Sequence, residues 1–188
     1  MHHIAIFASG TGSNAEKIIA YFRENIQIKV SLVVSNKPDA KVLAIAVENG
    51  VPTLVIHRTS FYSSKDLLNE LQAQNIDLVV LAGFLWLTPK YLVEAYPNAI
   101  INIHPALLPK YGGKGMYGHH VHEAVKAANE TESGITIHYV NENYDEGAPI
   151  FQAKCPLSTH DSPTDIAKKV LALEHHHLPR VIESLLTA

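Results

Sequence analysis

The chain has 188 residues, of which 47% are hydrophobic and 18% charged, and a formal net charge of −3 at pH 7. This length suits one medium-sized domain with its own core, and a weakly negative chain without a basic stripe argues against nucleic acid as its main partner. No apolar run approaches the ~20 residues that span a bilayer, and a single cysteine, Cys155, excludes an internal disulfide and fits a reducing cytosol.

Short β-branched runs alternate along the chain with segments of helical period. We expect strands at residues 4–8, 30–35, 53–56, 78–82, 99–103, 134–140 and 150–155. We expect helices at residues 14–24, 42–49, 64–74, 89–95, 117–128 and 163–186. The opening "MHHIAIFASG" has no charged start before its apolar run, so it predicts a first strand and not a signal peptide.

The early strands are apolar on both faces, as in "IAIFA" and "LVVLA", which is typical of parallel strands covered by helices on each side. The alternation of strands and helices therefore predicts a single doubly wound α/β domain over residues 1–188. The last helix is expected to pack back onto the sheet, because its apolar residues recur at near-helical spacing. These residues are Ile166, Val170, Leu173, Val181 and Leu185.

The segment "FASGTGSNAEKI" follows the first expected strand and opens the first helix. Gly10 and Gly12 allow a tight turn and a close approach to a ligand. Ser13 or Asn14 is expected to cap the helix, whose first amides and dipole favour an anion. The segment therefore predicts a phosphate site, with a plain strand-to-helix turn as the alternative.

The same turn also matches a dinucleotide fingerprint, Gly10-x-Gly12-x-x-Ala15. That fingerprint expects an acid at the end of the second strand, where this chain has "SNK" at residues 35–37. NAD is therefore the weakest of the three interpretations. The polar side chains of the turn suit a terminal phosphate better: Ser9, Thr11, Ser13 and Asn14.

Two polar residues, Asn102 and His104, end the expected strand "AIINIHP". The period of two places them on one face, and Pro105 predicts the end of the strand. Ligands of open parallel sheets bind at the carboxyl ends of strands, so both side chains are expected in a cleft. An amide and an imidazole at this spacing suit a carbonyl reaction, the amide holding an oxyanion and the imidazole moving protons.

A third polar member is expected in "HYVNENYDEGAPI", where Asp145 lies in a loop between two strands. A carboxylate near His104 is expected to raise the pKa of the imidazole and favour its protonated form. The alternative is that His104 is a hydrogen-bonded strand terminus and Asp145 an ordinary turn residue. His138, in "GITIHYV", is expected to be a buried core histidine, with a hydrogen bond beside the site as the alternative.

The segments "SGTGSN", "VVLAGF", "NIHPALLPKY", "GITIHYV", "DEGAPI" and "LEHHHLP" occur in an order and spacing that resemble the phosphoribosylglycinamide formyltransferase family. This resemblance covers almost the whole chain. It implies a mainly parallel seven-stranded sheet with helices on both faces. It also implies transfer of a formyl group from 10-formyltetrahydrofolate, as co-substrate, to the primary amine of glycinamide ribonucleotide in purine synthesis.

The resemblance implies a catalytic set of Asn102, His104 and Asp145, with neither a metal nor a covalent enzyme intermediate. Asn102 and a protonated His104 would stabilise the oxyanion, and a water held by Asp145 would carry a proton from the amine to the departing folate nitrogen. The residues implied for the phosphate, the ribose and the glycinamide arm are Gly12, Ser13, Asn14, Glu174, Gly83 and Pro105.

The folate residues implied by the resemblance lie in two loops and at two further positions. They are Leu85, Trp86, Leu87 and Thr88, Asn102, the loop of Asn141, Glu142, Asn143 and Tyr144, and Lys65. Lys65 stands where the family often has an arginine facing the glutamate tail, and it keeps the charge but loses the bidentate fork. Trp86 replaces an arginine common in bacterial relatives and is expected both to pack and to line the pocket. The segment 112–122 is longer than in many members and lies beside the expected cleft.

Two related enzymes and one binding module are the alternatives. A formyltetrahydrofolate deformylase is expected to carry a further domain before the first strand, and a methionyl-tRNA formyltransferase a basic domain after the last helix. A non-catalytic nucleotide-binding module would explain the glycine turn and leave the three polar residues without a role. Twelve histidines invite a metal hypothesis, but adjacent histidines do not share a helix face, so no metal site is expected. We expect a cytoplasmic monomer or homodimer that binds small molecules and no membrane.

Overall fold

The computed structural model describes residues 1–187, and all seven of its strands join one sheet in the order β3-β2-β1-β4-β5-β6-β7. Strands β1 to β5 pair in parallel, whereas β6 is antiparallel to both of its neighbours, β5 and β7. The strands are β1 (His2–Phe7), β2 (Ile28–Ser35), β3 (Thr53–Val55), β4 (Ile76–Leu81), β5 (Ile100–His104), β6 (Glu132–Tyr139) and β7 (Pro149–Pro156). The α/β architecture with a mainly parallel seven-stranded sheet is therefore confirmed.

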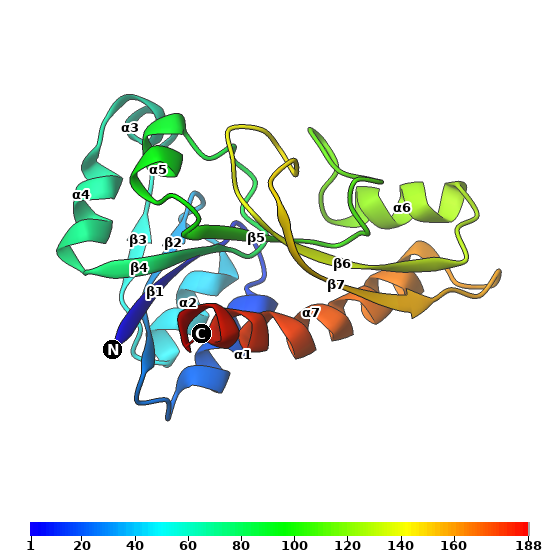
Figure 1. The fold of residues 1–188 in the computed structure, drawn as a ribbon, viewed down its shortest axis with the longest axis horizontal. Helices are drawn as coiled ribbons and strands as arrows, with labels where there is room; N and C mark the ends of the chain where they lie inside the picture. The colour runs from blue at the N-terminus through cyan, green and yellow to red at the C-terminus, as the bar shows by residue number, and fades with distance from the viewer. Residues whose placement is uncertain (188) are drawn as a thin grey trace.

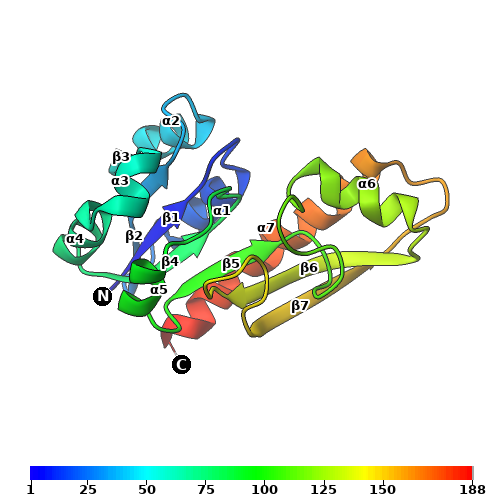
Figure 2. The same cartoon turned by 90° about the horizontal axis from the view of Figure 1, so that it is seen from above.

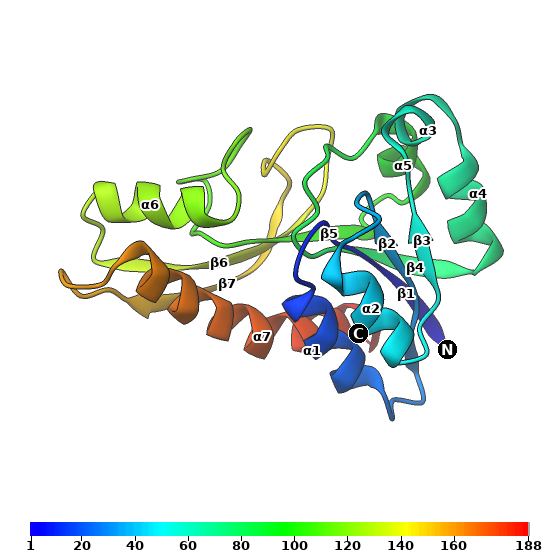
Figure 3. The same ribbon diagram turned by 180° about the vertical axis from the view of Figure 1, so that it is seen from behind.

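Helices cover both faces of this sheet, as Figures 1 and 2 show. One face carries α3 (Arg58–Ser63), α4 (Asp66–Ala73) and α5 (Lys90–Ala95), and the other carries α1 (Ser13–Phe22), α2 (Lys41–Glu48) and α7 (Pro163–Thr187). Helix α6 (His119–Ala127) packs against α7. Figure 3 shows α1, α2 and α7 together from behind.

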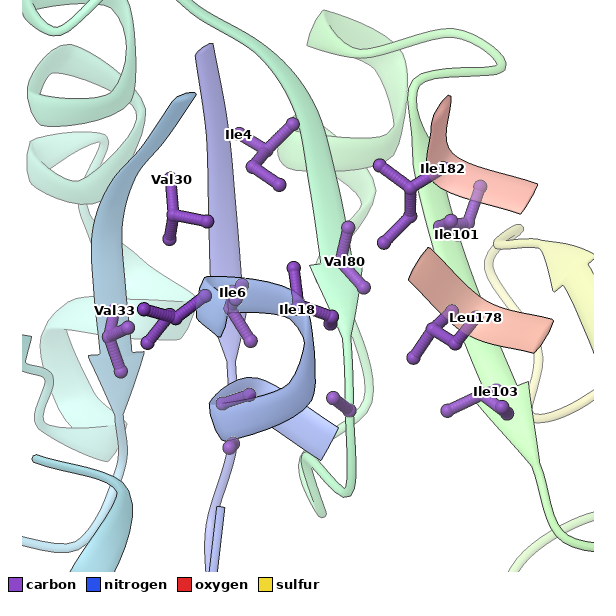
Figure 4. Close-up of a cluster of buried hydrophobic side chains, with 14 of the residues drawn as sticks. Ile4, Ile6, Ile18, Val30, Val33, Val80, Ile101, Ile103, Leu178 and Ile182 are labelled. Atoms are coloured by element: carbon purple, nitrogen blue, oxygen red, sulfur yellow. The ribbon is translucent and has the colours of Figure 1, made fainter. Parts of the chain in front are cut away.

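The alternation of side chains along the strands produces two cores. In β1, Ile4 and Ile6 pack against α1 and α7, while Ala5 and Phe7 pack on the opposite face. Figure 4 shows Ile18 of α1 and Leu178 and Ile182 of α7 lying over this first core. Both faces of these strands are buried because both carry helices, which accounts for their unbroken apolar sequence. The expected return of the last helix to the sheet is confirmed.

Most elements lie within two residues of their expected bounds, and one helix was missed. Residues 58–63 form the short helix α3, where no helix was expected. Only Phe61 of this helix is buried, so its six residues show no repeat that could reveal it. The phenol of Tyr62, in the same helix, donates a hydrogen bond to the carbonyl oxygen of Leu87, which ties α3 to the loop after β4.

The strand order reverses direction between β1 and β4, because β2 and β3 extend to one side and β4 and β5 to the other. The carboxyl ends of strands at such a switch point form a crevice in open α/β sheets. The amide of Ser9 donates to the carbonyl oxygen of Gly83 across this point. Among residues 1–187, no helix is both long enough and apolar enough to cross a bilayer.

Candidate active site

A cavity of about 860 Å³ opens at the carboxyl ends of β1, β4 and β5. Its walls come from residues 9–14, 81–88, 102–105, 113–119 and 143–145, and from α7. This volume lies within the range of pockets that hold drug-sized ligands. The cavity brings together segments that lie far apart in the sequence, including almost all of the residues expected at the site.

The glycine-rich turn forms one end of the cavity. Gly12 has a φ of 77°, and α1 begins at Ser13 without a side-chain cap, so the expected capping by Ser13 or Asn14 is wrong. Asn14 cannot cap the helix because its side chain is turned toward α7. The first amides of α1 are therefore left for an anion, and Lys37 lines the cavity at the same end.

Asn14 and Glu174 join α1 to α7 at the cavity wall. Nδ2 of Asn14 donates to Oε2 of Glu174 at 2.6 Å, while Oδ1 of Asn14 is enclosed and has no partner within the described chain. Glu174 is only 8% exposed, and burial raises the pKa of its carboxyl, although the bond from Asn14 opposes this shift. The pair presents buried acceptors, which suit hydroxyl donors of a ligand.

Asn102, His138 and Asp145 meet beyond the end of β5. Nδ1 of His138 donates to the carbonyl oxygen of Tyr139 at 2.8 Å, which leaves its Nε2 as an acceptor for Nδ2 of Asn102 at 3.1 Å. Nδ2 of Asn102 also makes a longer bond of 3.4 Å to Oδ1 of Asp145. Both amide hydrogens of Asn102 therefore face protein acceptors. His138 is buried and also bonded within the site, so both expectations for it hold.

His104 faces Asp145 through one ring nitrogen and the backbone through the other. Its Nε2 donates to the carbonyl oxygen of Tyr111 at 2.7 Å, and its Nδ1 lies 3.5 Å from Oδ1 of Asp145. Asp145 has a φ of 58°, and its Oδ2 accepts the amide hydrogen of Gly113 at 2.9 Å. The Gly113 amide and the two imidazoles thus hold the Asp145 carboxylate in place. The backbone of Asp145 is left-handed, a conformation that aspartate tolerates better than most residues.

The pKa of His104 is lowered, whereas the sequence predicted that it would be raised. His104 is 3% exposed, and burial lowers the pKa of its imidazole more than the Asp145 carboxylate and the Tyr111 carbonyl raise it. The expectation of a resting protonated His104 is therefore wrong, although Asp145 acts in the expected direction. Burial would by itself raise the pKa of Asp145, but His138, His104 and the Gly113 amide together lower it below its ordinary value. At neutral pH the site holds an ionised Asp145 beside a mostly neutral His104.

The loop after β4 forms another wall of the cavity. Leu85, Trp86, Leu87 and Thr88 line it, together with Asn143 and Tyr144 from the loop after β6. Trp86 also packs against Phe61 at a ring distance of 5.5 Å, so it both packs and lines the pocket as expected. Lys65, Asn141 and Glu142 lie outside this lining, and Glu142 instead faces Lys90 at 3.4 Å.

Several cavity residues were not singled out from the sequence as site residues. Lys37, Lys114, Tyr117 and His122 line the cavity. Lys37 lies two residues after the end of β2, and that position next to the expected phosphate turn was the available signal. Among residues 1–187, no group of three or more histidine, cysteine, aspartate or glutamate side chains is arranged to hold a metal ion.

A family profile described as formyl transferase matches residues 2–182. A chloroplastic phosphoribosylglycinamide formyltransferase of Arabidopsis thaliana is 40% identical over 97% of this chain, which spans only 64% of that relative's length. The phosphoribosylglycinamide formyltransferase of Bacillus subtilis is 36% identical over 99% of this chain and 95% of its own. A crystal structure of the enzyme so named from Anaplasma phagocytophilum superposes with a TM-score of 0.91 at 32% identity, covering 99% of this chain and 87% of that chain.

Proposed function

Because this chain belongs to the formyl transferase family, we propose that it transfers the formyl group of 10-formyltetrahydrofolate to the primary amine of glycinamide ribonucleotide. The products are formylglycinamide ribonucleotide and tetrahydrofolate. Support for this acceptor comes from the relatives described above, and in particular from the phosphoribosylglycinamide formyltransferase of Bacillus subtilis, which this chain matches over nearly its full length. The expected single domain over residues 1–188 and the expected cytoplasmic location stay predictions.

One observation carries the proposal. Asp145 lies 3.4 Å from Asn102 and 3.5 Å from His104, in the same cavity as an uncapped helix N-terminus. The acceptor carries a phosphate, which suits the helix N-terminus, and a nucleophilic amine, which suits the polar cluster. A nucleotide-binding module would need the turn but would leave the polar cluster without a use.

The acceptor lies along the cavity from the glycine turn to His104. Its phosphate binds the amides of Gly12, Ser13 and Asn14 with Lys37 as the counter-charge, because anions favour the first turn of a helix. Its ribose hydroxyls donate to Glu174. Its glycinamide arm passes between Gly83 and Pro105, which line the cavity before Asn102.

The donor takes the wall formed by residues 85–88 and by Asn143 and Tyr144. Leu85, Trp86 and Leu87 supply apolar area for the pterin, and the backbone of this loop supplies hydrogen-bonding groups. Lys65, Asn141 and Glu142 keep their predicted folate roles for the outer part of the donor. Holding both substrates in one cavity converts their encounter into an effectively unimolecular step.

The amine nitrogen attacks the formyl carbon, and the carbonyl electron pair moves to the oxygen. Nδ1 of the neutral His104 takes a proton from the attacking amine, directly or through a water held by Asp145, and the imidazolium formed is stabilised by Asp145 at 3.5 Å. Asn102 exchanges its long bond to Asp145 for one to the oxyanion. The oxyanion then re-forms the carbonyl, the bond to folate N10 breaks, and His104 returns its proton to that nitrogen.

The test is an assay of the full chain with both substrates in the presence of a chelator. We expect formylglycinamide ribonucleotide and tetrahydrofolate to form in equal amounts, because each transfer releases one molecule of each. The chelator is expected to have no effect, because no metal is needed to activate a primary amine. The matched variant His104→Ala removes the proton carrier and is expected to lower turnover by at least about 100-fold, the lower end for general acid–base groups.

The alternative functions have distinct signatures in the same assay. Formate release without the acceptor would identify a deformylase, and tight NAD binding without formyl transfer would identify a nucleotide-binding module. Either result would overturn the proposal. The expected assembly of the protein as a monomer or homodimer stays a prediction, and sedimentation would measure the oligomeric state directly.

A further inference from the structure

Helix α6 places against the cavity a buried imidazole that none of the roles above uses. His122 lies on the buried face of α6 with Val121 and Val125 and is only 6% exposed, yet it lines the cavity. Its helix neighbours His119 and His120 are more than half exposed and bridge to Glu123, although His119 also lines the cavity. His122 is therefore set apart from the surface histidines of the same helix.

Nδ1 of His122 is fully enclosed and has no hydrogen-bond partner inside the described part of the chain. Buried polar side chains in native proteins almost always have a partner, so an unpaired one calls for a specific reason. Since Nδ1 is enclosed, Nε2 is the ring nitrogen left for a ligand in the cavity.

The charge state of this ring follows from its surroundings. Burial, and then the neighbouring rings of His119 on α6 and His104 on β5, lower the pKa of His122 to about 4. The ring is therefore neutral at pH 7 and suits uncharged amide or amine groups better than a phosphate or a carboxylate.

The position of α6 decides which substrate His122 meets. Helix α6 packs against α7, which carries Glu174, and His122 is close enough to His104 for the His104 ring to lower the pKa of His122. The donor wall at residues 85–88 is instead tied to α3 by the bond from Tyr62 to Leu87. His122 thus stands on the acceptor side of the reacting centre.

We propose that His122 is a positioning residue that hydrogen-bonds the glycinamide arm of the amine acceptor through Nε2 and so sets the affinity for that substrate. This inference rests on the proposed function. It gives a role to the long segment 112–122, which brings α6 to the cavity. The arm carries N–H and C=O groups, which match the single donor or acceptor that a neutral imidazole offers at Nε2.

Three variants at one position separate hydrogen bonding from packing. The amide of His122→Gln reaches the place of Nε2, the amide of His122→Asn reaches only that of Nδ1, and His122→Leu supplies neither. We expect Leu and Asn to raise the KM for glycinamide ribonucleotide about tenfold, equivalent to ~1.4 kcal/mol, with kcat and the KM for the folate nearly unchanged. Glutamine is expected to restore most of the affinity.

His120→Leu is the matched control, because its side chain is 62% exposed and lies on the same helix. The inference is overturned if His122→Leu leaves the acceptor KM unchanged, if both substrates lose affinity equally, or if asparagine serves as well as glutamine. Should the leucine variant not fold, the comparison of asparagine with glutamine decides alone. A wild-type chain without formyl transfer would overturn the proposed function and the inference together, whereas active wild type with unaltered variants would overturn the inference only.

Discussion

At the scale of single residues, the opposed effects on His104 make its pH dependence a test of the site. Burial lowers the pKa of His104 while Asp145 raises it, and the net pKa is below that of a free imidazole. The proposed mechanism requires a neutral His104, so kcat/KM is expected to hold through neutral pH and to fall only below about pH 6.5. Asp145→Asn removes the raising contribution, so the acid limb is expected to move to still lower pH. Turnover in this variant is expected to fall about 100-fold.

Glu146→Gln is the matched control for Asp145→Asn. Glu146 is the next residue of the same loop, is exposed, and accepts a bond from Asn143 away from His104. The pH profiles of kcat/KM for the wild type and both variants provide the measurement. An acid limb that stays in place in Asp145→Asn would show that His104 is not the group being titrated.

The sequence was sufficient to predict that Asn102, His104 and Asp145 lie together, but not to describe their electrostatics. A period of two and a following proline place two side chains in a cleft, and the loop between two later strands suggested the carboxylate, which the resemblance joined to the other two. The resting charge of His104 instead depends on how deeply the ring is buried and on the Tyr111 carbonyl that its Nε2 meets. Those surroundings come from a loop whose path no local pattern in the sequence determines.

At the scale of elements, two glycines in one turn are expected to differ sharply in their tolerance of a side chain. Gly12 has a φ of 77°, and a Cβ there would lie 2.7 Å from Cβ and 2.8 Å from Cα of Val42 in α2. Gly12→Ala is therefore expected to cost about 3 kcal/mol, from overpacking against α2 and from left-handed strain. The free energy of unfolding in urea measures this effect.

Gly10→Ala is the control for the same turn. A Cβ at Gly10 meets no atom within 4 Å, and its φ is outside the left-handed region. We expect a change in unfolding free energy within about 0.5 kcal/mol, as for ordinary surface positions. Equal losses in the two variants would contradict the view that the close approach of Val42 and the left-handed φ make Gly12 intolerant of a side chain.

Elements with a strong pattern were predictable, and those shaped by contacts were not. The strands "IAIFA" and "LVVLA" are buried on both faces, so their unbroken apolar runs predict them directly. Helix α3 has one buried residue, Phe61, and owes its place to aromatic packing with Phe84 and Trp86. Lys65 was assigned by resemblance alone, and it lies just before α4, outside the cavity lining.

At the scale of the whole molecule, buried neutral histidines link the stability of the fold to pH. His122 takes up a proton at about pH 4 in the folded chain and at about 6.5 when unfolded. The unfolded state therefore binds more protons as the pH falls through this window, and folding stability is lost from pH 6.5 down to pH 4. This difference between the folded and unfolded pKa of His122 corresponds to about 3 kcal/mol at the lower end of the window. His104 adds a loss of the same sign.

Replacing His122 by phenylalanine isolates its share of this pH dependence. Glu174 acts with the opposite sign, because a raised carboxyl pKa stabilises the fold at low pH, but it is present in both proteins and cancels in the comparison. Urea unfolding at pH 7 and pH 4.5 is expected to show a loss smaller by about 2–3 kcal/mol in His122→Phe than in the wild type. His120→Gln, on the exposed face of α6, is expected to behave as the wild type does. If the phenylalanine variant loses as much stability as the wild type, the buried ring must already be protonated near pH 6.5, and its neutral state at the acceptor would be untenable.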